Sequence, residues 1–155
     1  MSTIIFTKEL ALQKIKQYCS YQQRCHKEVR EKLHSFSLYK KEREEIISQL
    51  IEENYLNEER FAIQFAGGKF RMKEWGRVKI KYALKQKQVS DYCIKKALKQ
   101  IAESDYLKTF NKLANQKLIT LKGEKNIFIK KKKLQDFLLQ KGFEAQIINE
   151  KLKSL

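Results

Sequence analysis

Basic side chains recur at helical spacing in the middle of the chain. Arg77, Lys81 and Lys85 are each four residues apart, so a helix would place them on one face. The surrounding stretch, residues 69–99, contains only two acidic side chains, whereas an ordinary solvated face carries both signs. Such a stripe attracts phosphates, with release of counterions from a nucleic acid, or an acidic protein groove. We predict six contact residues here: Lys69, Arg71, Lys73, Arg77, Lys81 and Lys85.

Two further features of the basic region have two interpretations each. Trp75 either stacks on a base or anchors an interface, or it packs in the hydrophobic seam between two helical units. The run from Lys130 to Lys133 is either a solvated helical turn or a secondary phosphate contact. Four consecutive side chains point around most of a turn, so they cannot all contact one surface. The sequence leaves both questions open.

Other combinations of reactive residues lack the spacing that their chemistry needs. The thiols of Cys19 and Cys25 and the imidazoles of His26 and His34 do not form the paired pattern of a structural zinc site. The two glycines before Lys69 lack the spacing of a phosphate-binding loop. The chain also has no motif of a serine hydrolase or a zinc protease. We therefore expect no metal, no cofactor and no catalytic site.

Composition favours an α-helical protein that binds a polyanion. The chain has 155 residues, no proline and only five glycines, which leaves little turn chemistry for a β-protein. Its formal net charge is +16, and the excess falls mainly after residue 54. No apolar run approaches the ~18–20 residues of a membrane span, and the N-terminus does not resemble a secretory signal. We expect a cytoplasmic protein, away from membranes, with its three cysteines reduced.

An internal repeat divides the chain into three helical units. A pair of apolar residues four positions apart occurs three times, with intervals of 51 and then 54 residues. These pairs are Val29/Leu33, Ile80/Leu84 and Leu134/Leu138. A period of this length is typical of a modular array in which each unit packs mainly on its neighbour. We predict an all-α protein of three tandem three-helix repeats over residues 7–54, 55–101 and 102–155.

Capping residues predict where the helices begin and end. Thr7, Asn57 and Ser90 each precede an amphipathic segment, where a side-chain oxygen can accept an unpaired backbone N–H. Gly142 suits the left-handed residue that ends a helix, followed by a packed Phe143. We expect nine helices, one after Thr7 and others near residues 25–35, 42–53, 57–72, 76–87, 90–101, 104–120, 125–140 and 144–153.

Apolar stripes on these helices predict the core. Residues expected there include Leu10, Ile15, Leu50, Ile51, Phe61, Leu84, Leu107 and Phe110. Gly67 and Gly68 fall inside the fourth helix or close to its end. Each glycine costs about 1 kcal/mol relative to alanine in a helix interior, so we expect a kink or fraying there.

Three segments in the middle of the chain form a recognisable pattern: the string YLNEERFA at residues 55–62, a basic run that ends in WGR at residues 75–77, and a following helix that ends in a leucine. In these segments the chain resembles the RecX regulatory proteins, which modulate the RecA recombinase. The segment RCHKEVREKL at residues 24–33 resembles the first repeat of that family, and residues 106–142 resemble its third. The resemblance therefore covers most of the chain.

This resemblance implies a non-enzymatic regulator that inhibits the recombinase or, less often, supports it. RecX proteins consist of tandem three-helix units in a curved, elongated molecule. They bind along the groove of the RecA–single-stranded DNA filament, where they hinder ATP hydrolysis and strand exchange or promote disassembly. We therefore expect a monomer whose partner is the RecA filament, with single-stranded DNA contacted directly or within the filament. The alternative is a stand-alone nucleic-acid-binding module, in which a mainly lysine stripe favours phosphate contact over base readout.

Overall fold

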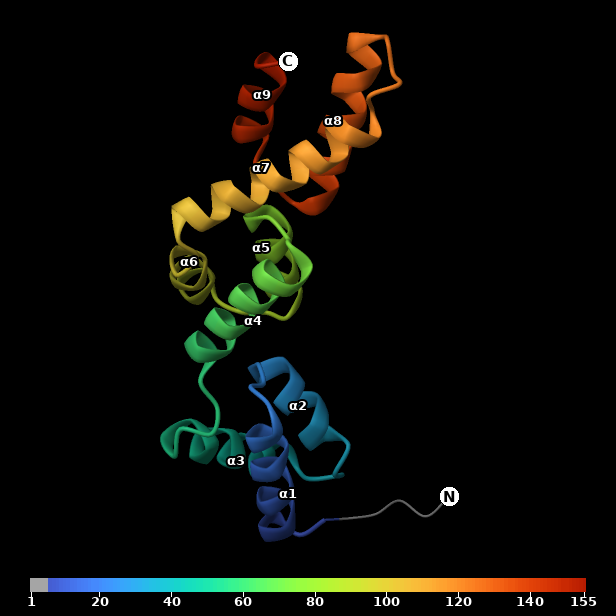
Figure 1. The fold of residues 1–155 in the computed structure, drawn as a ribbon. Helices are drawn as coiled ribbons and strands as arrows, with labels where there is room; N and C mark the ends of the chain where they lie inside the picture. Colours follow the sequence, from blue (N-terminus) through green and yellow to red (C-terminus); the bar gives the residue numbers. More distant parts are fainter. Residues whose placement is uncertain (1–5) are drawn as a thin grey trace.

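The computed structural model describes residues 6–155, and this part of the chain is helical without strands (Figure 1). Its helices are α1 (Lys8–Tyr21), α2 (His26–His34), α3 (Lys40–Glu52), α4 (Glu58–Lys73), α5 (Arg77–Gln86), α6 (Asp91–Lys99), α7 (Glu103–Thr120), α8 (Ile127–Lys141) and α9 (Ala145–Lys153). They form three sets of three that follow one another along an elongated, curved molecule, which we call the first, second and third units (Figure 1). The all-α repeat array is confirmed, whereas the bounds 7–54, 55–101 and 102–155 remain predictions.

The predicted caps account for where several helices begin and end. The Asn57 side chain accepts a hydrogen bond from the Arg60 N–H at 2.9 Å. Thr7 and Ser90 cap α1 and α6 in the same way. Gly142 ends α8 with a φ of 95°, in the left-handed region, and the Phe143 that follows it is buried. These contacts are local, so the sequence could predict them.

The buried side chains form two separate cores. The first unit has its own core, completed by Leu56 from the linker to α4. The second and third units share one continuous core, which runs from Phe61 in α4 to Ile148 in α9. The helices α4–α9 therefore form one packed body, and the first unit is a second body attached to it.

A small, mostly polar set of contacts joins these two bodies. Arg60 on α4 donates a hydrogen bond from Nε to the Gln23 side chain at 2.8 Å. Lys27 Nζ donates to the backbone carbonyl of Gln86 at 3.2 Å. The thiol of Cys25 is the one first-unit side chain within the α4–α9 core of the described residues. Burial raises the pKa of this thiol to about 11, so Cys25 packs as a neutral group.

The core differs from the predicted one at three positions. Leu10, Ile51 and Leu107 are 39%, 47% and 37% exposed, so their assignment to the core is wrong. In α1 and α7 the buried positions are Ala11 and Tyr106, one residue away from the predicted leucines. Periodicity fixes the spacing of a buried stripe, but the neighbouring helix decides which of two adjacent apolar residues it covers.

The helix α4 continues through its two glycines. It runs without interruption from Glu58 to Lys73, so the fraying expected at Gly67 and Gly68 is absent from this described helix. Both ends of α4 are held by tertiary structure, since Phe61 near its start and Phe70 near its end are buried in the shared core. Packing of an apolar face outweighs the propensity cost of about 1 kcal/mol per glycine.

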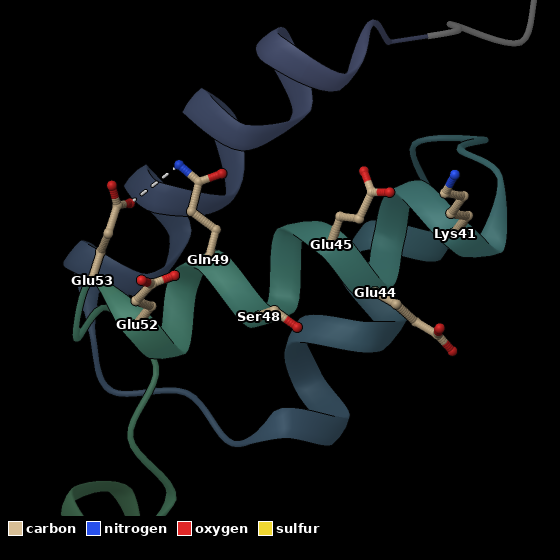
Figure 2. A pocket seen from close by; sticks show the side chains of 7 residues that line it. All are labelled: Lys41, Glu44, Glu45, Ser48, Gln49, Glu52 and Glu53. Carbon is tan, nitrogen blue, oxygen red and sulfur yellow. Dashed lines mark hydrogen bonds between the residues drawn. The ribbon is translucent and has the colours of Figure 1, made fainter.

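Acidic side chains gather on the first unit. Figure 2 shows a surface pocket along α3, and its lining residues are Lys41, Glu44, Glu45, Ser48, Gln49, Glu52 and Glu53. Two of these glutamates are paired with α1, because Lys8 contacts Glu45 and Lys16 contacts Glu53 at 3.0 Å. No group of residues in the described part of the chain could hold a metal ion. This pocket belongs to the first unit and lies outside the α4–α9 body.

Candidate nucleic-acid interface

A groove lined with lysines runs between α5 and α6. Lys81 and Lys85 from α5 and Lys95 from α6 line a cavity of about 280 Å³, together with Ile94, Leu98 and Asp91. A second cavity of about 450 Å³ shares Lys95 and Leu98 with it and adds Lys99. Because the two cavities share residues, they form one surface feature, which we call the α5–α6 groove. It has lysines on both sides and an apolar floor.

The four groove lysines form no ion pairs in the described part of the chain, although Asp91 and Glu103 also line the groove. Lys81, Lys85, Lys95 and Lys99 are all exposed, and none takes part in an ion pair within residues 6–155. By contrast, the neighbouring Lys96 lies 3.6 Å from Glu59. Flexible ammonium groups on two sides of a groove can reach phosphate oxygens that pass between them. The arrangement suits a sugar–phosphate backbone.

Arg77 lies at the end of this groove and is already engaged within the chain. Its guanidinium contacts Glu144 at 3.0 Å and also pairs with Glu103. It lies over the Tyr106 ring, 3.7 Å from the centroid. Burial alone lowers the pKa of Arg77, but the hydrogen bonds to Glu103 and Glu144 raise it above its ordinary value. Contact between Arg77 and a partner stays a prediction, and these intramolecular contacts compete with it.

The backbone beside Arg77 joins the second unit to the third. The Gly76 N–H donates to the Lys141 carbonyl at 2.8 Å, and the Val78 N–H donates to the Gly142 carbonyl at 2.9 Å. The first N–H groups of α5 are thus satisfied by the last carbonyls of α8, with the positive end of one helix dipole against the negative end of the other. We call this contact, at residues 76–78 and 141–142, the α5–α8 junction.

Glycine is required where these two backbones meet. A Cβ on Gly76 would lie 2.3 Å from the Gly142 carbonyl oxygen, and a Cβ on Gly142 would lie 2.2 Å from the Lys79 Cβ. Real Cβ atoms do not approach other atoms so closely, and the positive φ of Gly142 adds a second reason for glycine. The WGR segment therefore has a structural role at this junction.

Tyr106 completes the junction from α7. Its hydroxyl accepts the Arg77 backbone N–H at 2.9 Å and donates to the Glu144 carboxylate. Burial, followed by the hydrogen bond to Glu144, raises the pKa of Tyr106. Sequence reasoning missed both Tyr106 and Glu144, because they lie 29 and 67 residues from Arg77 and have no local signal.

The basic residues of α4 do not line the groove itself. Lys69 Nζ lies 5.0 Å from the centre of the Trp75 ring, and Lys79 Nζ lies 4.8 Å from it. Arg71 lines a cavity of about 310 Å³ that shares Ile101 and Ala102 with the cavity of about 450 Å³, so it adjoins the groove, and Lys73 is exposed. Trp75 is partly buried against the α4–α9 core, which favours the hydrophobic seam over a base-stacking platform.

The six predicted contact residues are only partly brought together. Lys81, Lys85 and Arg77 line the groove, although Arg77 also belongs to the junction. Arg71 lines the adjoining cavity, and Lys69 and Lys73 line neither. Lys95 and Lys99 were not predicted as contacts. Their four-residue spacing on α6 was visible, but only the packing of α6 beside α5 shows that they share a surface with Lys81 and Lys85.

The fold and this surface define a class of helical repeat protein with a basic groove. Within residues 6–155, no helix is long and apolar enough to cross a membrane. Residues 57–98 match the family model of the second three-helix domain of RecX, and residues 95–152 match that of the third. The chain therefore belongs to the RecX family of regulatory proteins.

Individual relatives agree with this assignment. The regulatory protein RecX of Prosthecochloris aestuarii is 30% identical over 138 residues, which cover 89% of this chain and 88% of the relative. That of Clostridium perfringens is 35% identical over 130 residues, 83% of this chain, but the chain spans only 60% of its length. The crystal structure of RecX from Lactobacillus salivarius has a TM-score of 0.84 at 26% identity, covering 96% of this chain and 97% of that one.

Proposed function

We propose that this chain is a non-enzymatic, negative regulator of a RecA-type recombinase. It binds the filament of recombinase on single-stranded DNA and modulates ATP hydrolysis and strand exchange. The α5–α6 groove is the observation that carries the proposal, because it presents four unpaired lysines on a rigid helical body. Membership of the RecX family supports the regulatory role.

The chemistry of the groove favours phosphate contact. Lysine is a flexible point charge that meets phosphate oxygens, whereas base edges are usually read by the planar groups of Arg, Asn and Gln. A regulator that binds any stretch of filament has to tolerate any DNA sequence. We propose the following contacts: Lys69, Arg71, Lys73, Arg77, Lys81 and Lys85 from the sequence, with Lys95 and Lys99 added from the structure.

The rigid α4–α9 body suits a partner with a regular surface. The shared core and the α5–α8 junction fix the angle between the second and third units. A binding surface held at a fixed angle loses less conformational entropy on association than two loosely linked domains would. We propose that Arg77 contributes to binding chiefly by holding this angle.

A second candidate function is a stand-alone nucleic-acid-binding module. The net charge of +16 and the groove favour it, since both attract naked phosphodiester backbones as well as a filament. The two functions differ in their response to salt and to competitor DNA. A stand-alone nucleic-acid-binding module should bind naked DNA tightly at ~200 mM salt, whereas a filament regulator acts on DNA that the recombinase already covers.

The test is a titration of single-stranded-DNA-dependent ATP hydrolysis by a RecA-type recombinase at physiological salt. We expect the chain to inhibit hydrolysis at sub-stoichiometric amounts, without rescue by excess DNA. A double variant of the groove, Lys81→Glu with Lys85→Glu, should need at least about tenfold more protein, because two phosphate contacts become repulsive. The matched control, Lys14→Glu with Lys41→Glu, makes the same charge change at exposed positions of the first unit and should inhibit normally.

The outcomes of this titration distinguish the proposed functions from one another. Normal inhibition by the groove variant would show that the groove is not the contact surface. Rescue by extra DNA would favour the stand-alone module. A wild-type chain without any effect on hydrolysis would refute the regulator. Arg77 is left unchanged in this design, because its substitution would disturb the α5–α8 junction as well as any contact.

A further inference from the structure

Exposed apolar side chains flank the turn between α7 and α8. Ile119 at the end of α7 is 62% exposed, and Phe128 in the first turn of α8 is 81% exposed. Ile127 and Ile129 on either side of Phe128 are each 43% exposed. This turn lies at the end of the molecule farthest from the first unit, where the ribbon is orange (Figure 1). We call these four residues the α7–α8 tip.

The tip is held in a fixed conformation. The Asn126 side-chain oxygen accepts hydrogen bonds from the backbone N–H groups of Phe128 at 3.0 Å and Ile129 at 3.4 Å. The Asn126 N–H in turn donates to Glu124 at 3.1 Å, and Glu124 lies 3.8 Å from Lys133. A capped first turn presents its side chains without further ordering, which lowers the entropy lost on binding.

Lysines adjoin the apolar tip in the sequence. Lys132 and Lys133 are paired with Asp136 and Glu124. The lysines nearest the tip that form no ion pair within residues 6–155 are Lys122, Lys125, Lys130 and Lys131. An apolar centre with a charged rim is the anatomy of a protein interface, and the sign of the rim selects an acidic partner.

We propose that the α7–α8 tip is an anchor that inserts Phe128 into an apolar cleft with an acidic rim on the recombinase subunit. The identity of this partner rests on the proposed function. The three isoleucines favour protein over nucleic acid, because aliphatic side chains offer bases no stacking surface. A bilayer surface is less suited, since the tip lacks the Trp and Tyr that interfacial anchors use.

The tip and the α5–α6 groove then bind the same filament at two points. Both belong to the rigid α4–α9 body, so their separation is fixed by the shared core. The groove contacts phosphates and the tip contacts protein. Two linked contacts of different chemistry give the chain a higher affinity for DNA covered by recombinase than for either component alone.

The experiment measures binding to a recombinase filament assembled on single-stranded DNA with a non-hydrolysable ATP analogue. Phe128→Ala should weaken filament binding at least about tenfold, as expected for an aromatic hot spot, and should leave binding to naked single-stranded DNA unchanged. Tyr21→Ala is the matched control, because Tyr21 is an aromatic residue with 84% exposure in the first unit. It should bind the filament like the wild type.

Four outcomes would overturn the proposal. Filament binding by Phe128→Ala at wild-type strength would mean that the tip is not an anchor. Equal weakening on naked DNA would make the tip a base-stacking site. If the wild type binds anionic lipid vesicles and Phe128→Ala does not, while filament binding by the variant is intact, the tip is a membrane contact. A wild-type chain that does not bind the filament would refute the proposed function together with the anchor, which distinguishes that failure from the other three.

Discussion

Gly76→Ala tests whether the α5–α8 junction holds the second and third units together. The added methyl group would lie 2.3 Å from the Gly142 carbonyl oxygen, 2.4 Å from the Gly142 carbonyl carbon and 2.5 Å from the Phe143 nitrogen. All three atoms belong to the backbone, so no side-chain rotation relieves the overlap. The N-terminus of α5 must therefore move away from the end of α8.

The expected loss of stability follows from what this movement breaks. The hydrogen bonds from Gly76 to Lys141 and from Val78 to Gly142 each contribute about 0.5–1.5 kcal/mol. Overpacking against the backbone adds about 1–3 kcal/mol. The sum is about 2–6 kcal/mol, a large part of the roughly 5–15 kcal/mol that stabilises a typical domain. We expect the free energy of unfolding of the α4–α9 body to fall by this amount.

Urea unfolding followed by circular dichroism provides the measurement, with Gly68→Ala as the control. Gly68 lies inside α4, and a Cβ there meets nothing within 4 Å, so alanine should raise stability by up to about 1 kcal/mol. The two substitutions are chemically identical and should act in opposite directions. If Gly76→Ala unfolds at the same urea concentration as the wild type, the close contact at the junction is not present in solution.

Three further substitutions probe the junction and the division into two bodies. Tyr106→Phe should lower the free energy of unfolding by about 1–3 kcal/mol in thermal melts, because it leaves the Arg77 backbone N–H and one carboxylate oxygen of Glu144 without their hydrogen-bond partner. The pKa of Tyr106 is raised in the folded state, so its contribution to stability is complete below the ordinary tyrosine pKa and is lost once the pH exceeds the raised pKa. The stability of the wild type should therefore fall with rising pH above ~10 more steeply than the stability of Tyr106→Phe. Leu50→Ala should lower the free energy of unfolding of the first unit by about 2–5 kcal/mol and leave hydrogen exchange in α4–α9 unchanged. Leu134→Ala should destabilise α4–α9 by a similar amount and leave exchange in the first unit unchanged. If either leucine variant accelerates hydrogen exchange equally in the first unit and in α4–α9, the chain unfolds as one cooperative unit.

Local signals in the sequence predicted most of the fold. Caps such as Asn57, Ser90 and Gly142 act within four residues of themselves, so their roles could be read without a structure. The repeated apolar pairs gave the number of units, because both members of each pair lie on one helix. Burial was predicted correctly for Phe61 and Leu84 and wrongly for Leu10 and Leu107. An apolar residue at the edge of a stripe is covered only if a neighbouring helix reaches it.

The candidate site was only partly predictable. The charge excess and the Lys81/Lys85 stripe follow from composition and helical periodicity. The sequence could not show that Lys95 lies across the groove from them, since that depends on how α6 packs beside α5. Nor could the sequence show that Arg77 is already bound within the chain, because its partners Tyr106 and Glu144 belong to the third unit.

The sequence by itself determined that this chain is a basic, all-helical repeat protein that resembles the RecX family. Net charge follows from composition alone, the resemblance follows from short motifs, and helix formation and capping depend on residues close together in the chain. Only the tertiary structure decided which basic residues share a surface, which one holds two units together, and which apolar residues remain exposed at the α7–α8 tip. These properties depend on pairs of residues tens of positions apart, and the energy of such pairs exists only after the helices have packed.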